Sequence, residues 1–163
     1  MEGRADLHMH TAHSDGAFST DELLRKANEA GLSIISITDH DNVAAVDEAI
    51  EAGKQYGIEV IPGVELSAGV GEQEVHILAY FFDHKNQDLL DHLMFFRMER
   101  VKRAERIVGK LNNLNVPLSL DAVLERAGMG SVGRPHIATA LYEEGLTGSY
   151  HEAFYKYIGN GKP

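Results

Sequence analysis

The first half of the chain alternates between strand-like and helix-like patterns, and this alternation constrains the fold more than any other feature. Residues 33–38, SIISIT, form a short and almost wholly apolar run, which is typical of a strand buried on both faces. The other expected elements are strands at 4–10, 58–62 and 74–81 and helices at about 20–30 and 43–56. Strands that alternate with helices are typical of parallel sheets with crossover helices. The sequence therefore predicts an α/β fold.

Local signals mark where the first two helices begin and end. Ser19, followed three residues later by Glu22, has the spacing of a capping box, and Gly31 lies where the first helix should stop. Asp41 or Asn42 is expected to cap the second helix, because short polar side chains accept hydrogen bonds from free amides at a helix start.

From about residue 86 the pattern becomes helical. One or two long, highly charged helices are expected first, and shorter helices follow near 119–127, 134–144 and 150–158. We therefore predict two parts: an α/β part over residues 1–85 and a mostly helical subdomain over residues 86–163.

Composition excludes several classes of protein. With 163 residues, 44% of them hydrophobic, the chain can bury a core of about one domain. It has no cysteine, so neither disulfides nor thiolate metal sites can form. No signal peptide or apolar run of about 18 residues is present, so we expect a cytoplasmic protein without membrane contact. The net charge of −10 argues against binding duplex DNA, but bound cations would still allow a phosphorylated substrate.

Histidines and carboxylates recur on strand after strand. His8 and His10 are two residues apart on the first strand, so both point to one face near its carboxyl end. Active sites of parallel barrels form at that end of the strands. The full set of candidate metal ligands is His8, His10, Asp15, His40, Glu65 and His76.

Each candidate also has an ordinary explanation, such as a surface histidine, a turn aspartate or a helix cap. Their recurrence at one rim favours a metal centre instead. Imidazole and carboxylate ligands without thiolate suit Mn²⁺, Fe²⁺ or Zn²⁺. Six ligands exceed the needs of one ion with open positions, so we expect two or three ions, with neighbours about 3.5–4 Å apart. Such centres hydrolyse phosphate esters by attack of a metal-bound hydroxide.

Four segments carry a family resemblance: DLHMHTAHSDG, TDHD, IPGVELS and VHILAYF. They resemble successive motifs of the PHP (polymerase and histidinol phosphatase) superfamily, and the resemblance covers essentially the whole chain. GRPHIATALYEEG and EAFYKYIGNGKP are similar to its free-standing bacterial branch. That branch contains nucleoside 3′,5′-bisphosphate phosphatases and a 5′→3′ exoribonuclease that acts on short RNA.

The resemblance implies both a fold and roles for individual residues. The fold would be the N-terminal part of a distorted (β/α)7 barrel with a helical insertion subdomain. The six candidates would bind three metal ions, of which Mn²⁺ is our first expectation, and Glu65 would bridge them. Arg134 and His136 would contact a substrate phosphate, although Arg134 could instead pair with a surface acid. We expect Asp39 to orient a ligand histidine.

These expectations define a metal-dependent phosphoesterase that acts on nucleotides or short single-stranded RNA. Beyond the metal ligands no nucleophile stands out, so no phosphoenzyme is expected. One alternative is an enzyme similar to histidinol phosphatase, whose amino-alcohol substrate should require acidic residues rather than Arg134. Another is an inactive module that only binds metal.

Members of the family continue for many more residues and supply a further histidine and a late Asp-x-His pair to the metals. We therefore expect this sequence to be truncated. The 163 residues alone should then bind metal weakly, self-associate or stay partly unfolded, and show little activity, which sedimentation and kinetic assays would test.

Overall fold

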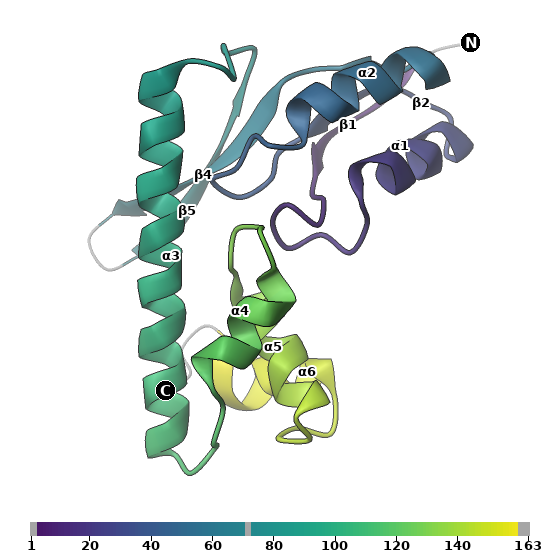
Figure 1. Ribbon diagram of the computed structural model, residues 1–163. Helices are drawn as coiled ribbons and strands as arrows, with labels where there is room; N and C mark the ends of the chain where they lie inside the picture. The colour runs from purple at the N-terminus through teal and green to yellow at the C-terminus, as the bar shows by residue number, and fades with distance from the viewer. Residues whose placement is uncertain (1–2, 71–72, 160–163) are drawn as a thin grey trace. The chain divides into compact units, whose positions relative to one another are not determined.

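The computed structural model describes residues 3–70 and 73–159 of a mixed α/β chain (Figure 1). The chain divides into two compact units, Met1–Arg97 and Met98–Pro163. Within the described residues, no helix is both long enough and apolar enough to cross a membrane.

The first unit contains the predicted parallel sheet. Strands β1 (Arg4–Met9), β2 (Leu32–Ile37) and β3 (Glu59–Val60) pair in the order β1-β2-β3, and both pairs are parallel. Helices α1 (Thr20–Glu29) and α2 (Val46–Tyr56) form the two crossovers. Their apolar faces pack with β2 in one cluster, formed by Leu23, Leu24, Ala27, Ile35, Ile37, Ala45, Ala49, Ala52 and Ile58. The α/β prediction for this part is confirmed.

The predicted helix signals have different outcomes. The capping box of α1 is present, since Ser19 accepts from the Glu22 amide and the Glu22 carboxylate accepts from the Ser19 amide. The predicted cap of α2 is wrong: the N-cap is Ala45, which makes no side-chain bond. Asp41 instead bonds to Ser67, whereas Asn42 accepts from the Ala44 amide before the helix and donates its side-chain amide to the His13 carbonyl at 2.7 Å.

Strands β4 (Gly63–Val70) and β5 (Gln73–Tyr80) pair with each other as an antiparallel hairpin. The sequence predicts β5 as the next strand of the parallel series, with a loop before it, and this detail is wrong. The physical reason is the short connection, because a parallel neighbour needs a crossover of a dozen or more residues. The start of β4 lies parallel to the chain just beyond β2, through a bridge between His40 and Glu65.

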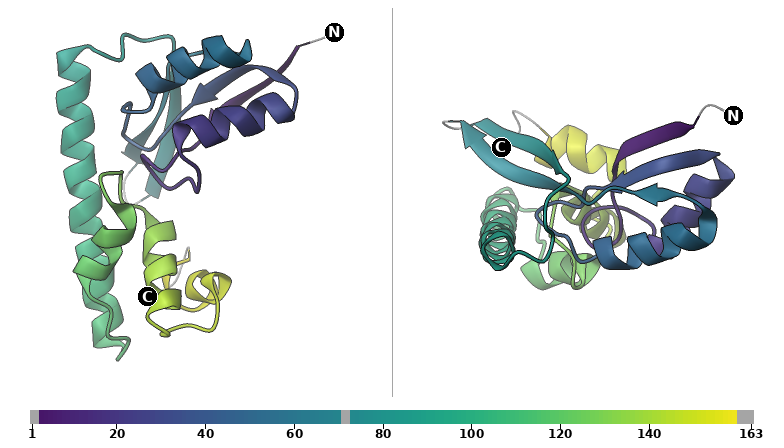
Figure 2. Two further views of the ribbon diagram at one scale, coloured as in Figure 1. Left: turned by 45° about the vertical axis from the view of Figure 1, so that its right-hand side comes forward. Right: turned by 90° about the horizontal axis from the view of Figure 1, so that it is seen from above.

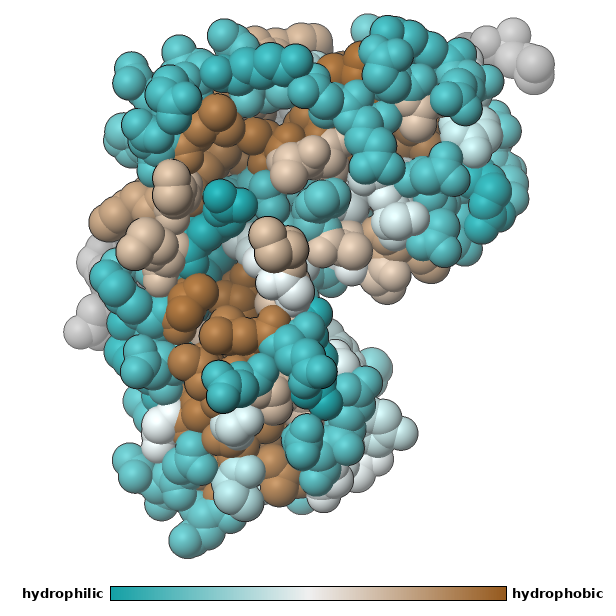
Figure 3. All heavy atoms as spheres, in the orientation of Figure 1, coloured by the Kyte–Doolittle hydropathy of each residue, from teal (hydrophilic) through white to brown (hydrophobic). Residues whose placement is uncertain are grey.

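The second unit is helical, as predicted. Helix α3 (Gln87–Asn113) begins in the first unit and is one long helix, seen almost end-on in the right-hand view of Figure 2. The helices that follow are α4 (Leu120–Ala127), α5 (Arg134–Glu143) and α6 (Tyr150–Ala153), which continues as a π-helical turn, η1 (Phe154–Ile158). Apolar side chains gather where α3 faces α4, brown in the lower part of Figure 3.

The predicted boundary between residues 85 and 86 lies just before α3, whereas the compact units divide within that helix, at Arg97 and Met98. The assignment of two domains stays a prediction.

Candidate metal centre

The first unit brings all six predicted ligands together. The rings of His8, His10, His40 and His76 follow one another, with centroids 5.1, 4.8 and 4.7 Å apart. Three overlapping groups each place one possible ligand atom per residue within 4.8 Å of the others: His8, His10 and Glu65; His10, Asp15 and His40; His40, Glu65 and His76.

The β-structure explains this convergence. His8 lies near the end of β1, His10 comes directly after β1, and His40 follows three residues after β2 ends. The carboxyl ends of these neighbouring parallel strands meet at one edge of the sheet. In the hairpin Glu65 pairs with Leu78 and Ser67 pairs with His76, so Glu65 and His76 are diagonal neighbours on one face.

The loop after β1 turns tightly enough to bring Asp15 back to the histidines. Its amides at Ser14 and Gly16 both donate to the Thr11 carbonyl, each at 3.0 Å. A Cβ at Gly16 would lie 2.2 Å from the His10 carbonyl oxygen. Only glycine fits there, which gives the Asp-Gly pair a structural role in presenting Asp15.

Glu65 occupies the middle of the site, with 8% of its side chain exposed. Its Oε2 atom lies 2.8 Å from His8 Nε2, 3.1 Å from His10 Nε2 and 3.7 Å from His40 Nδ1. Its Oε1 atom lies 2.7 Å from His76 Nδ1. One carboxylate thus faces four histidines through its two oxygens, an arrangement suited to bridging neighbouring ions.

Asp15 completes the ring of candidates. Its Oδ1 lies 3.5 Å from His10 Nδ1, and its Oδ2 lies 3.4 Å from His40 Nε2. The two nitrogens of His40 therefore face different carboxylates.

The residues present fit divalent metal ions. His40 Nδ1 is buried and has no hydrogen-bond partner within the described part of the chain. A buried polar atom left without a partner costs about 1–3 kcal/mol, and a cation would satisfy this nitrogen. The donor set of imidazoles and carboxylates, with no sulfur, suits Mn²⁺, Fe²⁺ or Zn²⁺.

The neighbours of Glu65 and the burial of His10 shift the pKa of each group toward the protonation state that a metal ligand needs. Burial alone would raise the pKa of Glu65, but the bond with His8 and the fields of His40, His10 and His76 outweigh burial and lower it. Burial lowers the pKa of His10, and the opposing effect of Asp15 does not cancel the shift. An ionised carboxylate and a neutral imidazole are the forms that bind metals.

Asp39 is buried beside the site, but it contacts the loop between His10 and Asp15 rather than a histidine ring. It accepts from the Thr11 amide at 2.7 Å and from the hydroxyls of Thr11 and Ser14, both at 2.6 Å. The Ser14 hydroxyl lies 3.3 Å from His10 Nδ1. Any orienting effect of Asp39 on His10 passes through Ser14, and this role stays a prediction.

Sequence reasoning missed the role of Asp41. Its carboxylate accepts from the Ser67 amide at 2.7 Å and from the Ser67 hydroxyl at 2.6 Å, and its own amide donates to the Glu65 carbonyl at 2.9 Å. The sequence feature that could have indicated this role is the position of Asp41 next to His40, in a motif with two aspartates.

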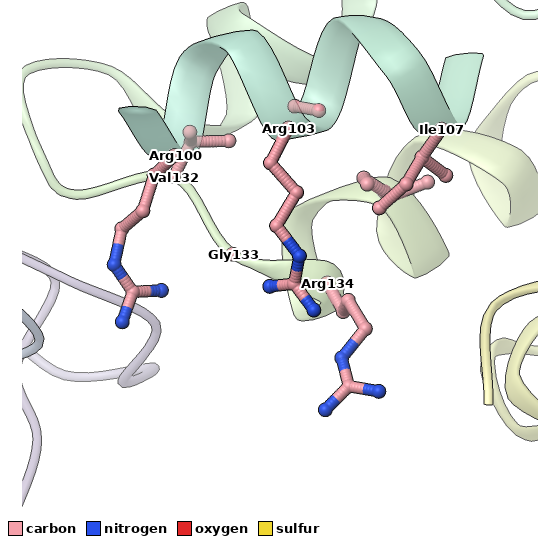
Figure 4. A pocket seen from close by; sticks show the side chains of 8 residues that line it. Arg100, Arg103, Ile107, Val132, Gly133 and Arg134 are labelled. Carbon is pink, nitrogen blue, oxygen red and sulfur yellow. The ribbon is translucent and has the colours of Figure 1, made fainter. Parts of the chain in front are cut away.

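The predicted phosphate contacts, Arg134 and His136, belong to the second unit. Gly133 donates its amide hydrogen to His136 Nδ1 at 2.9 Å, so the neutral ring carries its proton on Nε2 and can donate from there. Arg134 lines a small hollow together with Arg100 and Arg103 (Figure 4). Sequence reasoning had not identified these two arginines. Their i, i+3 spacing on α3 was the available signal.

Comparison with known proteins identifies the class to which this fold and site belong. Residues 6–156 match the PHP domain. The chain therefore belongs to the PHP domain family.

Individual relatives are similar over nearly the whole chain. A 5′-3′ exoribonuclease from Haemophilus influenzae is 36% identical over 99% of this chain, which spans 59% of that relative. A 3′,5′-nucleoside bisphosphate phosphatase from Chromobacterium violaceum is 30% identical over 97% of the chain, which spans 56% of it. The chain thus spans little more than half the length of these relatives.

Solved structures agree with this fold. An amidohydrolase from Chromobacterium violaceum superposes with a TM-score of 0.88 at 29% identity, over 99% of this chain and 57% of its own. A protein from Bifidobacterium adolescentis, predicted to be a metal-dependent phosphoesterase, superposes with a TM-score of 0.85 at 32% identity, over 100% and 60% of the two chains.

Proposed function

We propose that the protein containing this chain is a metal-dependent phosphoesterase that hydrolyses phosphate esters of nucleotides or of short single-stranded RNA. The observation that carries the proposal is the six-residue cluster in which Glu65 faces four histidines. The activities named for its relatives, an exoribonuclease and a nucleoside bisphosphate phosphatase, support the substrate class.

His8, His10, Asp15, His40, Glu65 and His76 would hold two or three ions, with Mn²⁺ as the proposed metal. Divalent ions supply the Lewis acidity that activates water and neutralises the leaving oxygen in phosphate ester hydrolysis. The chain's own contribution is to bring these six side chains together, to lower the pKa of Glu65 through the bond with His8 and the neighbouring histidines, and to lower the pKa of His10 by burial. A cytoplasmic location remains part of the proposal.

Arg134 and His136 would bind a phosphate group of the substrate. Arg134 presents a planar guanidinium that can form paired hydrogen bonds to phosphate oxygens, and His136 Nε2 can donate as well. Arg100 and Arg103 extend from α3 into the same hollow and add positive charge (Figure 4). The Chromobacterium violaceum structure contains bound sulfate, an anion with the shape of phosphate.

Hydrolysis of a panel of substrates tests the proposal, measured as release of inorganic phosphate from the phosphomonoesters and as release of mononucleotides from RNA. The protein is stripped of metal with EDTA, supplied with Mn²⁺, and assayed on a nucleoside 3′,5′-bisphosphate, a short 5′-phosphorylated RNA and histidinol phosphate. We expect Mn²⁺-dependent turnover of the first two. Turnover of histidinol phosphate alone would favour that alternative, and Mn²⁺ binding without turnover of any substrate would favour an inactive module.

In the full-length protein, replacing Arg134 by alanine should mainly raise KM for a nucleoside 3′,5′-bisphosphate, because a phosphate clamp binds ground and transition states alike. We expect a rise of about 10-fold or more, from the loss of one charge-assisted bond worth about 1.5–3 kcal/mol, and a smaller effect on a substrate with a single phosphate. Steady-state kinetics on both substrates measures the difference.

Arg126→Ala is the matched control, since that guanidinium lies in the same unit but pairs with Glu143 at 2.9 Å and Glu144 at 3.3 Å. It should leave KM unchanged. Equal losses on the two substrates for Arg134→Ala would show a structural role instead.

A further inference from the structure

Three arginines of the second unit line one small hollow. Arg100 and Arg103 come from α3, and Arg134 is the first residue of α5. Figure 4 shows the three side chains extending in the same direction, with their guanidinium groups in a row in the order Arg100, Arg103, Arg134. Among the described residues that line the hollow, none is acidic. In a chain with a net charge of −10, the hollow is a local concentration of positive charge that favours an anion.

An apolar floor supports the arginine side chains. Ala104, Ile107, Val132 and Ile137 line the same hollow, and they belong to the apolar core of the second unit. The methylene groups of arginine can lie along such a surface while the guanidinium group faces outward. Arg100 itself is only 6% exposed. A guanidinium group held in this way loses little further freedom when it binds, which favours a preformed anion site over a mobile surface charge.

A row of guanidinium groups suits a strand that carries several phosphates. Each guanidinium can form paired hydrogen bonds to phosphate oxygens. The Cβ atoms of residues three apart on a helix lie about 5–6 Å from each other, so the long side chains of Arg100 and Arg103 can reach neighbouring phosphates. A nucleoside 3′,5′-bisphosphate has only two phosphate groups, one of which must react, and this leaves one for three arginines. An RNA strand offers a phosphate at every nucleotide.

We propose that Arg100 and Arg103 bind the phosphodiester backbone of an RNA strand, next to the phosphate that Arg134 holds. The inference rests on the proposed function for its substrate class, and it adds the residues that favour an RNA strand over a mononucleotide. Contacts with phosphates carry no information about the bases. The preference therefore concerns the length of the strand and not its sequence.

Binding of RNA to the full-length protein in EDTA tests this assignment, because removal of metal suppresses hydrolysis. The probe is a fluorescent, 5′-phosphorylated oligouridylate followed by anisotropy, with a nucleoside 3′,5′-bisphosphate as competitor. Arg103 is partly exposed, so Arg103→Gln should fold. The variant should weaken binding of the oligouridylate by about 10-fold or more, the effect expected for one charge-assisted hydrogen bond, and weaken binding of the bisphosphate by less.

The dependence of binding on salt separates a phosphate contact from a structural effect. For single strands, the logarithm of the binding constant falls with the logarithm of the salt concentration, with a slope of about 0.7 for each phosphate contact. Arg103→Gln should therefore reduce the steepness of this fall by about 0.7. Arg103→Lys keeps the charge and should keep the slope. An oligoadenylate should show the same changes as the oligouridylate.

Arg106→Gln is the matched control, since Arg106 is an exposed arginine three residues further along α3 and is not among the residues that line the hollow. It should bind the oligouridylate as the wild type does. Full affinity or an unchanged salt slope in Arg103→Gln would overturn the proposal, as would an equal weakening of the oligouridylate and the bisphosphate. A wild type that hydrolyses the bisphosphate with Mn²⁺ but does not bind the oligouridylate would overturn this proposal alone. If the wild type with Mn²⁺ hydrolyses neither substrate, the proposed function fails instead.

Discussion

Replacing Glu65 by glutamine is expected to reduce Mn²⁺ binding from more than one ion per chain to one at most. Glutamine keeps the shape of the side chain, but it loses the negative charge and one of the two oxygens. Two of the three ligand groups contain Glu65, whereas His10, Asp15 and His40 form a group without it. Calorimetric titration with Mn²⁺ gives the number of ions, and circular dichroism shows that the fold is retained.

The rate of phosphate release should fall by at least about 100-fold when these ions are lost. That factor is the upper end of the range for losing a group that only supports a metal ligand, and Glu65 is itself a proposed ligand. Glu59→Gln is the control, since Glu59 is an exposed carboxylate in β3 of the same unit. This control should change neither the number of Mn²⁺ ions bound nor the rate of phosphate release. A Glu65→Gln protein that binds as many ions as the wild type would show that this carboxylate is not shared between ions.

The sequence was sufficient to predict that the candidate ligands following the parallel strands lie close together. The short apolar run at residues 33–38 is typical of a buried strand, and the helices on either side of it favour crossovers to parallel neighbours. Once the strands are parallel, residues that follow their carboxyl ends must lie at one edge. His10 and His40 could therefore be placed together without knowledge of the packing.

The partner of a strand could not be predicted in the same way. The segment Gly63–Val70 mixes apolar, small and acidic residues, so its pattern alone does not identify a strand. Its pairing with β5 depends on contacts formed only in the folded chain, which is why strand tendencies vary with context.

Hydrogen bonds between residues far apart in the chain could not be predicted from the sequence either. Asp41 looked like a helix cap because capping is a local property, but its partner Ser67 lies 26 residues away. The bonds of Asp39 to Thr11 and Ser14 also span more than twenty residues. Such networks follow from the fold and cannot be read from spacing along the chain.

The network of Asp39 leads to the second large effect that we expect. Replacing Asp39 by alanine should destabilise the first unit by about 3 kcal/mol. The change removes the acceptor for three donors, the amide and hydroxyl of Thr11 and the hydroxyl of Ser14, at sites where both residues are fully buried. Each buried donor left without a partner costs about 1–3 kcal/mol, and partial relaxation of the loop would recover some of the sum. Urea unfolding, followed through the amide signals of β1 and β2, measures the loss.

Two further variants separate lost hydrogen bonds from lost packing. Asp47→Ala removes an exposed aspartate of α2 and should change the free energy of unfolding by no more than about 0.5 kcal/mol. The triple variant Asp39→Ala, Thr11→Ala, Ser14→Ala removes both hydroxyl donors together with their acceptor. The loss in free energy of unfolding for this triple variant should be smaller than the sum of the losses for its three single variants, because only the Thr11 amide then lacks a partner. An Asp39→Ala protein that unfolds at the same urea concentration as the wild type would show that water replaces the carboxylate, and that Asp39 does not hold the loop carrying Asp15.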